Sequence, residues 1–187
     1  ELIIADSTLI SNNTANDNGG GIVIHSISQI LNSFVHANNA SNGGGLSGEG
    51  NLYIENSHFI GNTASQIGGG VYYSSGELQI NHSKISNNMA NEGGGGFIES
   101  INPLIQFSEI ANNQSNNIGG GLLFSSGEDP SSPTINNCTI VDNNSEVQGS
   151  GVLSKNSTNP LIQNSILWGN ISPDAVQIYL QDNSELN

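Results

Sequence analysis

The sequence predicts an all-β protein, a right-handed parallel β-helix solenoid of about seven coils of ~25 residues, with three strands per coil. Three observations lead to this prediction. A run of glycines recurs at a nearly constant interval, an isoleucine recurs in register with it, and apolar residues alternate with polar ones along short segments. The right-handed sense is expected because parallel strands are almost always joined by right-handed crossovers.

The glycine runs give the period of the repeat. They lie at Gly19–Gly21, Gly43–Gly45, Gly68–Gly70, Gly93–Gly96 and Gly119–Gly121, followed by a degenerate run at Gly149–Gly151. Their first residues are 24, 25, 25, 26 and 30 positions apart. A repeat of this length is typical of a solenoid, in which each coil buries its apolar face against the next. We expect the glycines at turns with positive φ and where two backbones pack closely.

Four further slots recur in every repeat and define its register. The isoleucine slot holds Ile4, Ile30, Ile54, Ile80, Ile105, Ile135 and Ile162. Three residues later a small residue follows, at Ser7, Ser33, Ser57, Ser83, Ser108, Cys138 and Ser165. The apolar slot beyond it holds Leu9, Val35, Phe59, Ile85, Ile110, Ile140 and Leu167. The asparagine slot holds Asn12, Asn38, Asn62, Asn88, Asn113, Asn143 and Asn170. Stacked coils place like on like, so we expect a buried isoleucine column and an asparagine ladder bonded along the axis.

The spacing within each repeat favours strands over helices. Apolar residues alternate with polar ones and many are β-branched or aromatic, whereas no long window has the spacing of an amphipathic helix. One strand is predicted directly after the glycines, one around the isoleucine and one after the small residue. In the third repeat these strands cover residues 70–73, 77–81 and 83–87.

An apolar-x-x-Asn motif (FIGN, ISNN, LWGN) recurs together with GGG and a following Ile, Leu or Val. In these motifs the chain resembles the right-handed parallel β-helix, or pectin-lyase-like, superfamily. It is similar in particular to the passengers of polymorphic outer-membrane autotransporters and to bacterial secreted β-helix repeat proteins. The resemblance covers nearly the whole chain and implies a structural or adhesive role in a secreted or cell-surface protein.

The domain organisation follows from the repeat. We interpret residues 1–187 as one parallel β-helix repeat domain, and as a fragment of a longer chain because both ends fall within the repeat. A solenoid cut between coils has unpaired strand edges, so we expect the segment to fray or to stack end to end. No apolar run approaches the ~20 residues of a membrane span, so this segment is not expected to insert into a membrane.

The charge restricts the partners. Lys and Arg number 2 against 16 Asp and Glu, for a formal net charge of −14. Such a surface repels nucleic acids and anionic membranes, so neither is an expected partner. A glycan or a surface protein is expected instead. A neutral glycan suits this charge better than a uronic-acid polymer, which would need Ca²⁺ as a bridge.

Stacking also predicts a group of outward side chains that could bind a ligand. After the small residue, an outward column runs through Thr8, Phe34, His58, Lys84 and Glu109, and the neighbouring strand carries polar residues. The candidate ligand-binding residues are Tyr53, Glu55, His58, Gln79, Asn81, Lys84 and Glu109. An acid and a base beside an aromatic ring suit a sugar. The alternative is a set of solvated charge pairs of small energetic consequence.

The alternative function is a carbohydrate-active enzyme, either a polysaccharide lyase or a glycoside hydrolase of the pectin-lyase-like class. The resemblance implies that a lyase would need carboxylates that bind Ca²⁺ and an Arg or Lys base, but the chain has no arginine and only Lys84 and Lys155. A hydrolase would need paired aspartates, and no Asp-Asp pair occurs. No catalytic residue is therefore assigned. Ice binding is a third hypothesis, disfavoured because the sequence lacks a regular Thr-x-Thr array.

Three other features of the sequence bear on ligand binding and packing. Glu128 and Asp129 are adjacent in the longest loop and are candidate Ca²⁺ ligands, although a hydrated acidic turn explains them as well; no other cofactor is expected. Cys138, the only cysteine, is expected to be a small buried residue. One outward slot after the glycines holds Val23, Ser47, Tyr72, Ile98, Leu123 and Leu153. This apolar column predicts either a contact surface or a face covered by the chain itself.

Overall fold

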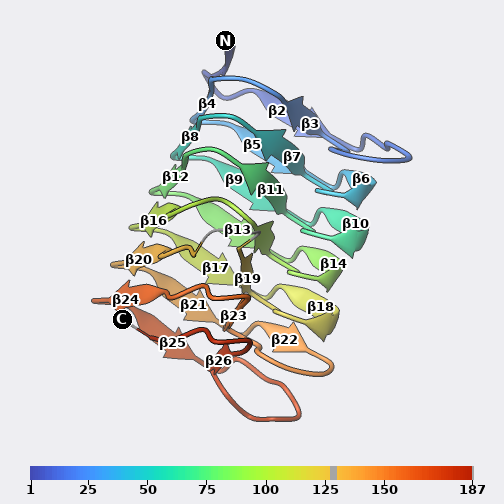
Figure 1. Ribbon diagram of the computed structural model, residues 1–187. Coiled ribbons are helices and arrows are strands. Elements are labelled where there is room, and N and C mark those ends of the chain that lie inside the picture. The colour runs from blue at the N-terminus through green and yellow to red at the C-terminus, as the bar shows by residue number, and fades with distance from the viewer. Residues whose placement is uncertain (127–129, 187) are drawn as a thin grey trace.

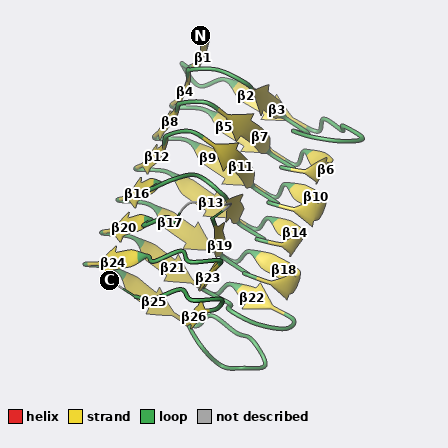
Figure 2. Ribbon diagram, in the orientation of Figure 1, coloured by secondary structure: helices red, strands yellow, loops and turns green. Residues whose placement is uncertain are grey.

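The computed structural model describes residues 1–126 and 130–186 as a stack of parallel coils, with the two termini at opposite ends (Figure 1). The described residues form strands, turns and loops without any helix (Figure 2). Accordingly, this part of the chain has no helix that is long and apolar enough to cross a membrane. Every strand pair is parallel and joins one coil to the next, which confirms the all-β parallel solenoid of about seven coils.

Sheet A carries the isoleucine column. Its strands are β1 (Leu2–Ile4), β4 (Ser28–Leu31), β8 (Leu52–Glu55), β12 (Leu78–Asn81), β16 (Leu104–Gln106), β20 (Thr134–Asn136) and β24 (Leu161–Gln163). The register places Ile54 between Ile30 and Ile80. The five central isoleucines are fully buried, and Ile4 and Ile162 at the two ends are partly buried against the same core. The predicted column is confirmed.

Sheet B follows sheet A in each coil and carries the apolar slot. Its strands are β2 (Leu9–Ser11), β5 (Phe34–His36), β9 (His58–Ile60), β13 (Lys84–Ser86), β17 (Glu109–Ala111), β21 (Thr139–Val141) and β25 (Ile166–Trp168). Val35, Phe59 and Ile85 point inward and are buried in the main core. Sheets A and B therefore contribute adjacent apolar walls to one continuous interior.

The first coil departs from the predicted register by one residue. Strand pairing and hydrogen bonds place Thr8, Ile10 and Asn13 in the slots predicted for Ser7, Leu9 and Asn12. Leu9 is 64% exposed, whereas Ile10 packs against the core. Asp6 and Ser7 both have positive φ, so the turn before β2 accommodates the additional residue. The outward column accordingly begins at Leu9 rather than Thr8.

A fourth sheet, sheet C, forms where the sequence predicted only a corner. Its strands are β6 (Asn39–Asn42), β10 (Thr63–Ile67), β14 (Met89–Glu92), β18 (Gln114–Ile118) and β22 (Asn144–Ser145). The prediction of three strands per coil is therefore too low for the central coils. The inward residues of sheet C are small, as at Ala40, Ala64 and Ser115. Small and amide residues have low strand propensity, so the sequence gives little sign of these strands.

Sheet D completes the coil after the glycines. Its strands are β3 (Ile22–Ile24), β7 (Leu46–Glu49), β11 (Val71–Ser75), β15 (Gly96–Ile98), β19 (Leu122–Ser125), β23 (Val152–Lys155) and β26 (Ile178–Leu180). The outward apolar column needs one correction, because Phe97 and not Ile98 pairs with Tyr72 and with Leu123. The fourth glycine of the run, Gly96, begins β15 and displaces the column by one residue.

The outward column of sheet D is covered over much of its length. Phe97, Leu123 and Leu153 form a second buried cluster, separate from the main core. Partly buried apolar residues pack against this cluster: Ile67, Tyr72, Ile118 and Tyr179. Of the two interpretations, a face covered by the chain itself therefore holds for this part of the column.

The asparagine ladder runs along the corner between sheets B and C. Asn38, Asn62, Asn88, Asn113, Asn143 and Asn170 are buried. The Nδ2 of each of the first five donates to the Oδ1 of the next ladder residue at 2.9–3.1 Å, and that of Asn170 donates to Gln177 Oε1. The same Nδ2 donates to a sheet B carbonyl of the preceding coil, as from Asn88 to Phe59 at 2.9 Å. Each Oδ1 also accepts a backbone N–H, so the ladder satisfies main-chain and side-chain groups together.

The third glycine of each run makes room for this ladder. A Cβ built on Gly70 would lie 2.9 Å from Asn88 Nδ2 and 2.6 Å from the carbonyl oxygen of Gly95. The same conflict recurs at Gly45 with Asn62 and at Gly95 with Asn113. The asparagine and glycine motifs of the sequence are therefore two halves of one packing arrangement.

Ile80 provides a test of the core. Its side chain is fully buried in the isoleucine column, so Ile80→Asp would place an unpaired carboxylate in an apolar interior. We expect a loss of about 4 kcal/mol or more of unfolding free energy, measured as a lower melting temperature by far-UV circular dichroism. Gln79→Asp, on the exposed face of the same strand, is the control and should change stability by less than about 0.5 kcal/mol. Equal melting curves for both variants would contradict the register.

Asn88 provides a test of the ladder. Asn88→Ala removes the acceptor of two donors of Asn62 and the donor to the Phe59 carbonyl, all in a buried corner. Unsatisfied buried groups cost about 1–3 kcal/mol each, so we expect a loss of about 3 kcal/mol or more in chemical denaturation. Asn91→Ala, at an exposed position of β14, is the matched control. A loss no larger than that of the control would exclude a structural role for the ladder.

Candidate functional site

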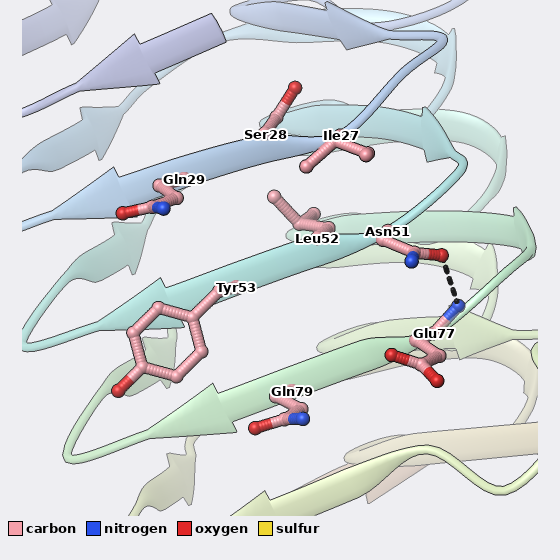
Figure 3. A pocket seen from close by; sticks show the side chains of 8 residues that line it. All are labelled: Ile27, Ser28, Gln29, Asn51, Leu52, Tyr53, Glu77 and Gln79. Atoms are coloured by element: carbon pink, nitrogen blue, oxygen red, sulfur yellow. Dashed lines mark hydrogen bonds between the residues drawn. The ribbon is translucent and has the colours of Figure 1, made fainter. Parts of the chain in front are cut away.

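A shallow groove lies on the outer face of sheet A and contains two of the predicted residues. Tyr53 lies between Gln29 and Gln79 on neighbouring strands, and Asn51 and Glu77 border the groove at the turn before each strand (Figure 3). This hollow has a volume of about 120 Å³ and adjoins a second hollow of about 570 Å³, which shares Asn51, Glu77 and Gln79. The groove therefore offers one aromatic ring among amide side chains.

The hydroxyl of Tyr53 is held in place by an adjacent acid. It donates to Glu55 Oε2 at 2.5 Å, and the other carboxylate oxygen of Glu55 lies 3.1 Å from His82 Nδ1. The bond to the Glu55 carboxylate, followed by partial burial, raises the pKa of Tyr53. The phenol is therefore fixed in its protonated form, with its ring placed over the outer face of the sheet.

Gln79 and Asn81 differ in accessibility although both point outward from β12. Gln79 is exposed and lines the groove, whereas Asn81 is only 5% exposed and pairs in register with Glu55 and Gln106. The Asn81 Oδ1 atom is buried and has no hydrogen-bond partner among the described residues. Gln79 is thus placed to contact a ligand directly, and Asn81 lies beneath the surface.

The other three predicted residues form a column on sheet B, as the register required. Lys84 pairs with His58 on one side and Glu109 on the other, and Lys84 Nζ lies 2.7 Å from Glu109 Oε1. The imidazole of His58 stacks on the ring of Phe34, with 4.9 Å between centroids. This column lies around a corner from the groove and is linked to it through Glu55 and His82.

Two residues at that corner were missed by the sequence analysis. His82 and Phe107 stack with centroids 4.9 Å apart, and both border a hollow of about 340 Å³ together with His58, Lys84 and Glu109. In four of the other coils asparagine occupies this corner position, at Asn32, Asn56, Asn137 and Asn164, and in the first coil it is Ser7. The sequence contains a sign of this corner, because His and Phe replace the usual Asn at the position directly before the recurring small residue.

The predicted Ca²⁺ ligands, Glu128 and Asp129, lie outside the described residues. Within the described part of the chain, no group of three His, Cys, Asp or Glu side chains is arranged to hold a metal ion. Cys138 is buried as expected, and burial raises the pKa of its thiol. Its Sγ lies 3.4 Å from the Asn136 carbonyl oxygen, in the small-residue slot of sheet B.

Comparisons with models of protein families, with curated proteins and with solved structures give no match to this chain. The enzyme alternative stays a prediction.

The link between Tyr53 and Glu55 can be tested by titration. In Glu55→Gln the carboxylate is lost, so the pKa of Tyr53 should fall toward its ordinary value of about 10. Phenolate absorbance measured against pH gives this value, and Tyr53→Phe identifies the transition. Glu77→Gln, which alters another groove carboxylate, should leave it unchanged. An unaltered Tyr53 titration in Glu55→Gln would show that the bond to Glu55 does not form in solution.

Proposed function

We propose that this chain is a structural and adhesive β-helix segment of a secreted or cell-surface protein, non-catalytic, and that it binds neutral glycans along the groove of sheet A. The single observation that carries this proposal is the placement of the Tyr53 ring between Gln29 and Gln79 on adjacent strands. A surface protein that carries such a glycan is the expected partner.

The chemistry of the groove suits a sugar. The C–H face of a pyranose is apolar and weakly electropositive, so it packs against the electron-rich face of an aromatic ring. Sugar hydroxyls both donate and accept hydrogen bonds, and the side-chain amides of Gln29, Gln79 and Asn51 do the same. Because successive strands of a sheet lie ~4.8 Å apart, these groups form a row along the coil axis that favours an extended chain.

The scaffold keeps this row rigid. Sheet A is hydrogen-bonded along its length, and the isoleucines directly beneath the groove are fully buried. A rigid surface loses little conformational entropy when a ligand binds, which favours affinity from a small number of contacts. The net charge of −14 favours a neutral ligand, because a polyanion would be repelled by the negative surface.

A secreted or cell-surface location is part of the proposal. The recurring asparagine and glycine motifs resemble those of autotransporter passengers and secreted β-helix repeat proteins, and their coupling in the ladder supports that relationship. In such a protein a stiff rod would hold the groove away from the surface that bears it. The relationship to the pectin-lyase-like superfamily is proposed for the β-helix fold alone and not for enzymatic activity.

The proposal is tested on an array of neutral and acidic glycans in the presence of a chelator. We expect binding of one or more neutral glycans, weakened at least about tenfold in Tyr53→Ala because the stacking surface is lost. Trp168→Ala is the matched control, since Trp168 is an exposed aromatic residue on β25, outside the groove. An array without any bound glycan, or equal binding by Tyr53→Ala and the parent chain, would refute the glycan proposal.

A further inference from the structure

The groove of sheet A contains a carboxylate that has no cationic partner. Glu77 lines both hollows of the groove, and it is the only Asp or Glu, of those that the structure describes, that lines either hollow. Its side chain is exposed and makes no ion pair within the described chain. The carboxylate of Glu55, by contrast, is already bonded to the Tyr53 hydroxyl. The groove therefore presents one unpaired negative charge beside its neutral amides.

The backbone of Glu77 is held firmly, although its carboxylate is free. Its N–H donates to Asn51 Oδ1 at 3.3 Å, and its carbonyl oxygen accepts from the Leu52 N–H at 2.8 Å and from the Tyr73 hydroxyl at 3.2 Å. Tyr73 is fully buried in the main core, so these bonds connect Glu77 to the rigid interior of the rod. A side chain on a fixed backbone loses less freedom when it binds a ligand.

The cations of the chain are used elsewhere. The chain has two lysines and no arginine, and each lysine already contacts a glutamate, at 2.7 Å from Lys84 and at 3.4 Å from Lys155. His25 and His82 also lie beside carboxylates other than that of Glu77. The net charge of −14 adds a negative potential around the rod, which attracts cations. A positive group on a ligand would therefore complement the groove.

The aromatic ring and the free carboxylate lie in the same hollow. Figure 3 shows Tyr53 toward one end of this hollow and Asn51 and Glu77 toward the other. Tyr53 pairs in register with Gln79, and Glu77 precedes Gln79 by two residues. The strand rise of ~3.3 Å and the rung spacing of ~4.8 Å therefore place the Cα atoms of Tyr53 and Glu77 about 8 Å apart. A sugar ring stacked on Tyr53 can direct a substituent along the groove to Glu77.

We propose that the groove of sheet A selects glycans that carry a free amino group, with the sugar ring on Tyr53 and the ammonium group bound to Glu77. This inference rests on the proposed function and specifies its ligand class. An ammonium group donates up to three hydrogen bonds and supplies the positive charge that the groove lacks. Charge-assisted hydrogen bonds are about twice as strong as neutral ones, so the amino sugar is favoured over its neutral analogues. N-acetylation removes the charge and with it the preference.

The test compares linear trimers of glucosamine, N-acetylglucosamine and glucose by calorimetric titration of the parent chain, at a mildly acidic pH that keeps the sugar amine protonated. We expect the glucosamine trimer to bind at least about tenfold more tightly than either neutral trimer. Glu77→Gln should reduce this ratio to about one, because it removes the charge and retains the shape of the side chain. Glu146→Gln is the matched control, because it removes the same charge from an exposed position outside both hollows, and should leave the ratio unchanged.

Equal binding of the three trimers would overturn the amino-sugar preference and leave the neutral-glycan proposal intact. A preference that persists in Glu77→Gln, or that Glu146→Gln abolishes as well, would also overturn it, because either result shows attraction to the overall charge. So would a lysine tripeptide that binds as tightly as the glucosamine trimer. Binding of the glucosamine trimer alone, lost in both Tyr53→Ala and Glu77→Gln, would support the preference and exclude neutral glycans as ligands. Absence of binding by every trimer would overturn both proposals.

Discussion

The structure depends above all on the contact between the asparagine ladder and the glycine runs. Each ladder side chain bonds to the next coil, to a carbonyl of the preceding coil and to a backbone N–H, so one residue per coil connects three rungs. A β-carbon on the third glycine of a run would collide with that side chain and with the carbonyl oxygen of the third glycine in the next coil, as at Gly70 with Asn88 and Gly95. Neither motif can change alone, and the pair therefore keeps both the period and the register of the coils.

This arrangement separates the residues that build the rod from those that give its surface character. Inward slots repeat isoleucine, small residues and asparagine, whereas outward slots vary from coil to coil. Because rungs lie ~4.8 Å apart, any set of outward residues becomes a row of fixed spacing. The groove around Tyr53 and the column of His58, Lys84 and Glu109 are two such rows, on adjacent faces of the same central coils.

Inward slots could be predicted from the sequence because burial restricts them to few residue types. The isoleucine column was identified in all coils, but the additional residue at Asp6–Ser7 and the fourth glycine, Gly96, each displaced a local register by one. Sheet C was missed because its inward residues are Ala and Ser, which carry no strand signal. The outward column of sheet B was predictable from the same stacking. The hollow beside it was not, because a period of two residues does not give the direction of a side chain at a left-handed corner.

The position of the corner hollow has a physical reason. A bulky residue with positive φ is tolerated only where the surrounding structure fixes the backbone strongly. His82 and Phe107, which have φ of 45° and 50°, lie in central coils, where the Asn62, Asn88 and Asn113 ladder bonds are complete and the isoleucines are fully buried. At both ends the core residues Ile4 and Ile162 are only partly buried, so the same strain would have less support there. The coils that the ladder holds most firmly are thus the ones that can retain strained aromatic residues at the surface, and both candidate sites lie on them.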